Sequence, residues 1–351
     1  MPQRRHLMFQ FVLALVLASC LRPSFAQQAP IVLRVADHLP PNHFLVAPLV
    51  RHWMDSVTRA TGGAVKFEYF PSEQLGKAKD MLAIALFGTA DITGVVPSYI
   101  TDKLPLSVVA ELPGSFASSC EGTLAFMPLV AEGGMLARHE YEPIGFRPLF
   151  SIVLPPYQLF SRPKIDSVKS FEGLKIQAAG GAKEIMIRKL KSVPVRMAAP
   201  ELYQSLSRGT IDGGMLGTGS FISYNLVGPA KYISRGENFG SVVAIWGMSE
   251  TRWKQLPESV RKAMLEAGAA ASRNTCAVAD AAVDSDYEKM RQGGVTAVTF
   301  SPADHQEIAA LAKTVQAEWK EALDKRGKPG SDVLKAFTDE LAARRGASPV
   351  R

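Results

Sequence analysis

Cysteine is scarce in this chain, charged residues are sparse, and long apolar runs are almost absent. The 351 residues include three cysteines, which excludes a disulfide-rich scaffold. Charged residues make up 21% of the chain and form no lysine- and arginine-rich block, so we expect no nucleic-acid partner. Hydrophobic residues account for 47%, a balance typical of a soluble globular protein with enough chain for two domains.

The one strongly apolar run lies at the N-terminus. A basic start precedes an apolar run over residues 7–18, and residues 24–26 offer small side chains for cleavage. Because the run is too short to span a bilayer, the pattern predicts a signal peptide over residues 1–26 and a periplasmic protein. Ordinary secretion is favoured over a twin-arginine route. A lipoprotein-like box at residues 17–20 leaves open a lipid anchor at Cys20.

Two cysteines remain after removal of the leader, Cys120 and Cys276. In an oxidising compartment they could pair, but the sequence does not give the distance between them. Two shielded free thiols are the expectation that we favour.

Strand and helix patterns alternate along the first part of the chain. Residues 31–36, 65–70 and 91–96 have the pattern of strands, and apolar residues at helical spacing occur over 45–57 and 77–87. This alternation predicts an α/β domain with a mainly parallel sheet.

The alternation of strand and helix patterns is interrupted near residue 145 and then resumes. Residues 146–154 are predicted to form a strand that crosses between domains, and residues 241–248 a strand that returns. A helical pattern over 257–292 would be roughly 50 Å long, more than one small domain needs. The expected organisation is lobe I over 27–150 with about 238–255 returning to it, lobe II over 151–237, a long bridging helix over 256–293, and a C-terminal strand and helices over 294–351.

Motifs of enzymes and of bound cofactors are missing. The chain has no G-x-S-x-G, H-E-x-x-H or Walker motif, and no G-x-G-x-x-G after a strand. His38 and His43 flank a loop, but two histidines without a third ligand make a poor metal site. We therefore expect a protein that is not an enzyme and that needs neither a cofactor nor a metal.

A series of short motifs occurs in a characteristic order along the chain. From the N-terminus these are Gly62-Gly63, residues 70–76, Gly88-Thr89-Ala90-Asp91, Glu111-Leu112-Pro113, residues 171–177, Glu201-Leu202-Tyr203, residues 208–213 and residues 253–257. Together they resemble the solute-binding proteins of tripartite ATP-independent periplasmic (TRAP) transporters, the C4-dicarboxylate-binding, DctP-like family. The resemblance implies a periplasmic-binding-protein-like α/β fold with two lobes, crossing strands and a long bridging helix. It also implies closure over one small ligand, which is delivered to membrane permease subunits driven by an ion gradient.

The resemblance also indicates candidate ligand residues in lobe II. Gln177 stands where the family usually has an arginine that clamps the substrate carboxylate, and Tyr157 falls loosely at the place of a second arginine. Met215 and Leu216 replace more polar residues after the Asp-Gly pair. An amide cannot offer a charged, bidentate fork, but it suits a hydroxyl, amide or carbonyl group. These departures predict a more apolar and aromatic pocket.

A glycine-rich loop offers another way to hold an anion. Gly180 and Gly181 precede a predicted helix whose free N–H groups could bind a carboxylate, and Lys183 or Arg162 could assist. For Lys183 we favour the alternative, a solvated helix residue. In lobe I, loops after the strands supply three weaker candidates: His38, Asn42 and Val96.

The predicted function is capture of a small organic acid by hinge closure between the lobes. The apolar lining favours an aromatic or branched carboxylate. Two alternatives remain open: a neutral, hydroxyl-bearing solute as the ligand, and a receptor that presents its ligand to a sensor protein.

Overall fold

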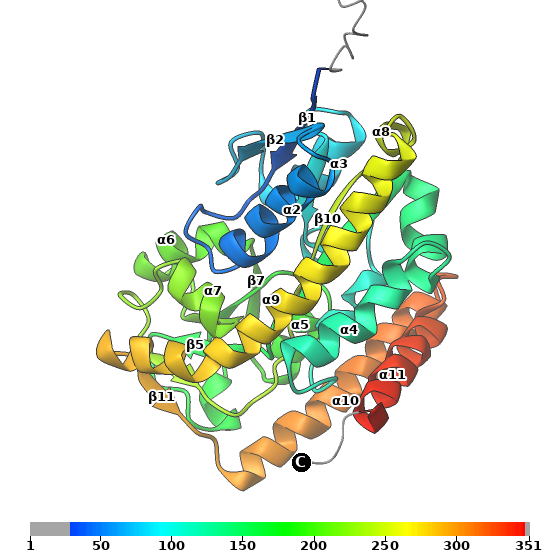
Figure 1. Cartoon of the computed structure of the whole chain (residues 1–351). Helices are drawn as coiled ribbons and strands as arrows, with labels where there is room; N and C mark the ends of the chain where they lie inside the picture. The colour runs from blue at the N-terminus through cyan, green and yellow to red at the C-terminus, as the bar shows by residue number, and fades with distance from the viewer. Residues whose placement is uncertain (1–28, 348–351) are drawn as a thin grey trace, which may run out of the picture.

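The computed structural model describes residues 29–347 (Figure 1). The predicted signal peptide and Cys20 lie outside this range. Two sheets form the centres of two lobes, which we call lobe I and lobe II. No helix within residues 29–347 combines the length and apolar character required to cross a membrane.

Lobe I is built on a five-stranded sheet with the order β2-β1-β3-β10-β4. Its first two strands, β1 and β2, coincide with the predicted ranges, since β1 is rich in β-branched residues and β2 in aromatic residues, and both types favour a pleated surface. The strands are β1 (Ile31–Ala36), β2 (Val65–Phe70), β3 (Ile92–Val95), β4 (Phe146–Val153) and β10 (Val243–Ser249).

Lobe II contains a six-stranded sheet with the order β11-β9-β5-β8-β6-β7. Three of its strands, β6, β7 and β8, are parallel neighbours. The strands are β5 (Gln158–Ser161), β6 (Lys175–Ala178), β7 (Val193–Arg196), β8 (Gly213–Leu216), β9 (Tyr232–Ser234) and β11 (Thr296–Val298).

The prediction of a mainly parallel sheet is confirmed, although one described strand in each sheet runs against its neighbours. β10 is antiparallel to β3 and β4, and β5 is antiparallel to β8 and β9. Both strands directly follow a crossing between the lobes. A chain that crosses without a helix enters the next sheet from the side where the other strands end, so it must run in the opposite direction.

A single helix, α9 (Glu258–Gln292), crosses the whole molecule, as Figure 1 shows. It contacts α2 and β4 of lobe I and α7 and β11 of lobe II, as the prediction of a bridging helix requires. Gly293 is the residue that caps its C-terminus. The other helices are α2 (His52–Ala60), α3 (Met81–Leu86), α4 (Ser119–Val130), α5 (Ala182–Lys189), α6 (Leu202–Ser207), α7 (Thr218–Ser223), α8 (Glu250–Lys254), α10 (Pro302–Asp324) and α11 (Gly330–Ala347).

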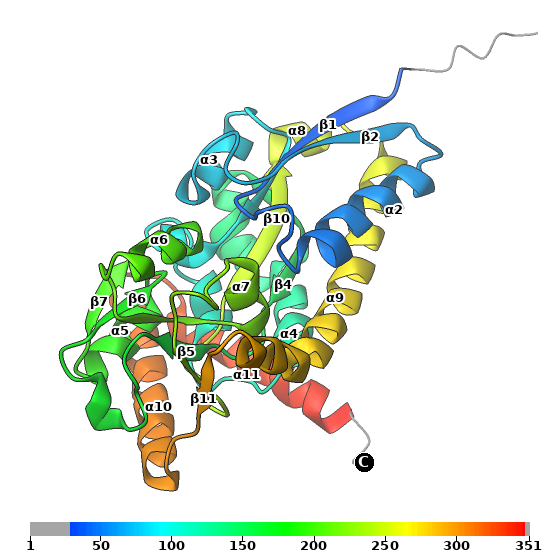
Figure 2. The same cartoon turned by 90° about the vertical axis from the view of Figure 1, so that its left-hand side faces the viewer.

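Buried aromatic side chains fix α9 against lobe I. The Trp53 indole donates a hydrogen bond of 3.0 Å to the Met264 carbonyl, and its ring lies 4.8 Å from that of Phe150. Phe150 in turn stacks on Trp246 of β10. Figure 2 shows β10 and β4 running together from the lobe I sheet toward lobe II. The bridging helix and the crossing strands therefore share one aromatic core.

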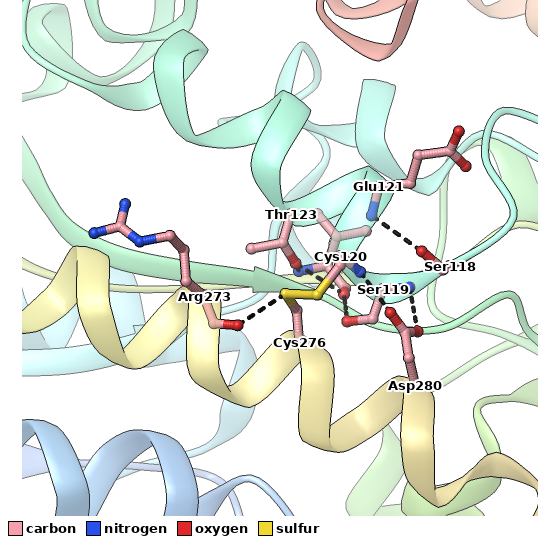
Figure 3. The surroundings of a disulfide bond; sticks show 9 residues. Ser118, Ser119, Cys120, Glu121, Thr123, Arg273, Cys276 and Asp280 are labelled. Carbon is pink, nitrogen blue, oxygen red and sulfur yellow. Dashed lines mark hydrogen bonds between the residues drawn. A yellow bond between two sulfur atoms is a disulfide. The ribbon is translucent and has the colours of Figure 1, made fainter. Parts of the chain in front are cut away.

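The expectation of two free thiols is wrong, because Cys120 and Cys276 form a disulfide (Figure 3). Cys120 lies in the first turn of α4, and the packing of α4 on α9 brings the two Cα atoms to 4.8 Å. One turn further along α9, Asp280 accepts hydrogen bonds from the N–H groups of Ser119 and Cys120. A carboxylate at the start of a helix is stabilising, so the disulfide and Asp280 hold α4 on α9 together.

Candidate functional site

The strands of both lobes end at a common interface. β1 and β3 of lobe I lead into loops that meet the loops after β6 and β7 of lobe II. The hydroxyl of Tyr99 accepts a hydrogen bond of 3.0 Å from the Ala199 N–H, and the Phe44 N–H donates to the Ser223 hydroxyl at 3.1 Å. These bonds close the lobes on one another. In open α/β sheets, ligands bind where strands end.

In lobe I, two side chains that follow β1 form part of this interface. Both oxygens of Asp37 accept hydrogen bonds, one from the Leu39 N–H and one from the Trp246 indole. His38 Nδ1 lies 3.4 Å from an Asp37 oxygen but forms no hydrogen bond with it, and it is buried without a hydrogen-bond partner among the described residues. The His38 ring meets the Tyr99 ring edge-on at 5.9 Å.

Burial keeps the histidines at this interface neutral. It lowers the pKa of His43 to about 3, and the nearby His38 adds to the shift. Burial also lowers the pKa of His38, although the Asp37 carboxylate opposes this. His43 Nε2 lies 3.3 Å from the Ser220 hydroxyl of α7, so a neutral imidazole joins the two lobes. Among residues 29–347, no group of three or more His, Cys, Asp or Glu side chains is arranged to hold a metal.

In lobe II, Gln177 is only 3% exposed on β6. Its Nε2 donates a hydrogen bond of 3.0 Å to the carbonyl of Met197, just beyond β7. Its Oε1 is buried and has no partner among the described residues. A Cβ atom on Gly214, its neighbour on β8, would lie 3.0 Å from that oxygen.

Tyr157 lies in the segment that joins β4 to β5, next to the hinge. Burial raises its pKa well above the ordinary value, and the proximity of Tyr99 and Glu111 adds to the shift. The ammonium group of Lys183 lies 5.4 Å from the centre of its ring, within the range of a cation–π interaction. The Tyr157 side chain is therefore uncharged, and its aromatic ring lies beside the buried ammonium group of Lys183.

The expectation that Lys183 is a solvated helix residue is wrong. Its Nζ lies 2.6 Å from Glu111 Oε2 and donates to the Ser241 carbonyl at 2.6 Å. Both side chains are 1% exposed. Lys183 comes from α5 of lobe II and Glu111 from the short helix Ser107–Glu111 of lobe I. A buried ion needs a partner of opposite charge, and each finds its partner in the other lobe.

The predicted anion-binding loop packs directly against lobe I. At Gly180 the backbone φ is +134°, and a Cβ atom would lie 2.4 Å from the Ser98 carbonyl oxygen. At Gly181 a Cβ atom would approach Val108 at 3.3 Å. Gly180 is therefore needed for close approach between the lobes, and its part in ligand binding remains a prediction.

A pocket of about 500 Å³ opens between the lobes, next to the interface contacts described above. None of the predicted ligand residues lines it, but two residues of its wall touch them. Met197 accepts the hydrogen bond from Gln177, and the ring of Tyr99 contacts His38. The lining comprises Glu73, Lys77, Ala78, Lys79 and Tyr99 from lobe I, and Ala179, Arg196, Met197, Ala198 and Glu201 from lobe II.

Arg196 is one of the lining residues that the sequence analysis did not identify. It ends β7, pairs in register with Ala178, and has a side chain that is 51% exposed. Its guanidinium donates to the Thr101 hydroxyl at 3.1 Å and lies 3.8 Å from Glu184. The available signal was the short run Val193–Arg196, whose valines favour a strand that ends at Arg196, because α/β proteins place ligand groups where strands end.

The remaining candidates do not share one surface. Met215 and Leu216 are adjacent on β8, so their buried side chains point to opposite faces of the sheet, and Leu216 shares the face of Gln177. Val96 is buried after β3, whereas Asn42 is exposed. Arg162 is exposed where β5 ends, away from the interface.

A second, larger pocket of about 710 Å³ lies away from the first one, between α9, α10 and the segments that join the lobes. Arg235, Glu237 and His305 are among its lining residues. Glu237 is already paired with His305 at 3.1 Å. Because the unpartnered atoms of Gln177 and His38 lie at the interface instead, the pocket between the lobes is the better candidate site.

Comparison with known proteins identifies the family. A model of the bacterial extracellular solute-binding proteins, family 7, matches residues 35–324. The chain belongs to this family. The match thus spans both lobes, the bridging helix and all of α10, and the predicted resemblance is confirmed.

Individual family 7 relatives are distant in sequence. A solute-binding protein of Roseobacter denitrificans is 24% identical over 259 residues, which are 73% of this chain and 78% of the relative. A marine-metagenome TRAP protein specific for aromatic acids, solved with 3-hydroxybenzoate, has a TM-score of 0.83 at 21% identity and covers 90% of this chain and 99% of its own. A TRAP protein of Rhodoferax ferrireducens, solved with benzoate, has a TM-score of 0.83 at 23% identity, with 91% and 100% covered. These structures confirm the two-lobed fold.

Proposed function

We propose that this family 7 protein binds a small organic acid with an aromatic body between its lobes and delivers it to the permease subunits of a TRAP transporter. The observation that carries the proposal is the pocket between the lobes, where Arg196 lies beside Tyr99 and Met197. A guanidinium with free N–H groups suits a carboxylate, and the two flanking side chains suit an apolar body. Two proteins of the same fold hold 3-hydroxybenzoate and benzoate, which supports this ligand class.

Binding and release, without turnover, complete the proposed role. The leader would export the chain to the periplasm. The closed lobes, joined by the Lys183–Glu111 ion pair and by the Tyr99 and His43 contacts, would be the form that the permease accepts. The ligand would favour this form by touching both lobes.

A thermal-shift screen of the mature chain tests the ligand class. The panel contains benzoate and 3-hydroxybenzoate as aromatic acids, succinate as a C4-dicarboxylate, and sorbitol as a neutral polyol. We expect the aromatic acids to raise the melting temperature most, because a ligand that binds only the folded state stabilises it. A shift with succinate alone would contradict the aromatic pocket, and a shift with sorbitol alone would favour the neutral alternative.

Two arginines that share one carboxylate provide a matched test of the site. Arg196 and Arg188 both lie near Glu184, but only Arg196 lines the pocket. We expect Arg196→Gln to weaken binding of the best acid by roughly tenfold or more and Arg188→Gln to leave it unchanged, as judged by calorimetry. Equal effects of the two substitutions would remove Arg196 from the site.

Gln177 is tested in the same assay. We expect Gln177→Ala to weaken ligand binding at least tenfold, whereas Gln306→Ala, at an exposed position of α10, should have no effect. An unchanged affinity of Gln177→Ala would show that Gln177 does not contact the ligand.

A further inference from the structure

Four buried polar atoms at the interface between the lobes have no hydrogen-bond partner among residues 29–347: Oε1 of Gln177, Nδ1 of His38, Oγ of Ser98 and Oε1 of Glu111. Each side chain is less than 5% exposed. Folded proteins rarely leave such atoms unpaired, because each costs about 1–3 kcal/mol. Because these atoms are concentrated at one interface, we expect a bound ligand to form hydrogen bonds with some of them.

The orientation of the Gln177 amide is fixed by its surroundings. The carbonyl oxygen of Met197 lies 3.0 Å from the amide nitrogen and can only accept a hydrogen bond. Rotating the amide by 180° would place two acceptors against each other. The free atom of Gln177 is therefore an acceptor, which repels a carboxylate and attracts a hydroxyl or N–H group.

Gly214 lies beside this buried acceptor on the neighbouring strand. A Cβ atom there would lie 3.0 Å from Gln177 Oε1, so a larger side chain would crowd the oxygen. Phe160 approaches the same point from β5, with its ring 2.6 Å from the position of that Cβ atom. The amide oxygen thus lies beside an aromatic ring, as suits a hydroxyl carried on an apolar or aromatic body.

We propose that Gln177 recognises a hydrogen-bond donor of the ligand, a hydroxyl or N–H group, and not its carboxylate. This inference rests on the proposed function, since it concerns the same ligand, and Gln177 reaches the pocket between the lobes through its hydrogen bond to Met197. It narrows the ligand class from small organic acids to hydroxy or amino acids with an apolar body.

Matched pairs of acids test the inference by calorimetry on the mature chain. 3-Hydroxybenzoate and 4-hydroxybenzoate are each compared with benzoate, and mandelate is compared with phenylacetate. We expect at least one hydroxylated acid to bind tenfold or more tightly than its partner, because the unhydroxylated acid leaves the buried acceptor unpaired. In Gln177→Leu, which keeps the volume without the acceptor, this preference should fall to about one.

A second variant reverses the polarity of the position. Gln177→Arg presents donors in place of the acceptor, so the unhydroxylated acid should gain affinity relative to its hydroxylated partner. The melting temperature of each ligand-free variant confirms folding, and Gln306→Leu is the surface control. This reversal would support the inference even if Gln177→Leu failed to fold.

The outcomes separate this inference from the proposed function. If the wild type binds both members of every pair equally well, the proposed function stands and the inference is overturned. A hydroxyl preference that survives Gln177→Leu also overturns it. If no acid of the panel binds, the proposed function fails and the inference fails with it.

Discussion

Replacing Lys183 by methionine tests whether the buried ion pair holds the lobes closed. Methionine preserves much of the length but removes the charge and both hydrogen bonds, to Glu111 and to the Ser241 carbonyl. The Glu111 carboxylate would then be buried without its cation. Removing one partner of a buried ion pair costs about 3–5 kcal/mol, since the remaining charge is shielded from water.

This cost should fall on the closed form. Lys183 belongs to lobe II and Glu111 to lobe I, so opening would let water reach the uncompensated carboxylate. Because each 1.4 kcal/mol is a factor of ten, a cost of about 3 kcal/mol corresponds to roughly 100-fold weaker ligand binding. The unfolding free energy of the ligand-free protein should change much less.

The assay combines calorimetric titration with urea unfolding of the ligand-free protein. Lys189→Met is the control, because Lys189 lies on the same helix in a more exposed pair with Glu318, worth about 0–1 kcal/mol. The double variant Glu111→Gln/Lys183→Met should recover much of the affinity, since no lone charge remains. If Lys183→Met keeps its affinity but loses about 3–5 kcal/mol of unfolding free energy, the pair is structural in both forms and our reasoning is refuted.

Three further predictions concern closure and stability. Gly180→Ala should weaken ligand binding at least tenfold, because its Cβ atom would strike the facing lobe. Gly173→Ala is the control, since Gly173 also has a positive φ but its Cβ atom would meet nothing within 4 Å. Equal affinities of the two variants in calorimetry would contradict this prediction. Burial raises the pKa of Glu140 from 4.5 to about 7, so its contribution to stability is present below pH 4.5 and lost as the pH rises through 7. In Glu140→Gln, the unfolding free energy measured with urea should therefore depend less on pH over that range. A pH dependence equal to that of the wild type would contradict this prediction. Replacing Cys120 and Cys276 by serine should lower the unfolding free energy by about 2–5 kcal/mol, and equal urea midpoints for the variant and the oxidised wild type would argue otherwise.

The parts of the fold that depend on local pattern were predictable. The strand Ile31–Ala36 and the helix Glu258–Gln292 follow from runs of β-branched residues and from helical spacing that ends at a glycine. Pairing between distant segments was not predictable. The disulfide joins residues 156 apart, and it required the packing of α4 on α9. The reversed strands β5 and β10 depend on the side from which the chain enters each sheet after it crosses between the lobes, which no local pattern reveals.

The candidate site shows the same limit. The sequence singled out Gln177, but the direction of its amide depends on the Met197 carbonyl, which belongs to another strand connection. Lys183 looked like a surface residue because nothing nearby in the sequence pairs with it. Its partner, Glu111, lies 72 residues earlier. Sequence reasoning can therefore propose the residue types of a site but not which of their atoms remain free.

The buried charges also constrain how an acid could lie in the site. Lys183 is neutralised by Glu111, and both oxygens of Asp37 already accept hydrogen bonds. A ligand carboxylate placed deep in the interface would add an anion near Glu111 without a free cation, which is costly in a medium of low polarity. At the mouth, the half-exposed Arg196 has donors to spare. The arrangement therefore favours a ligand whose carboxylate stays near Arg196 rather than deep in the interface.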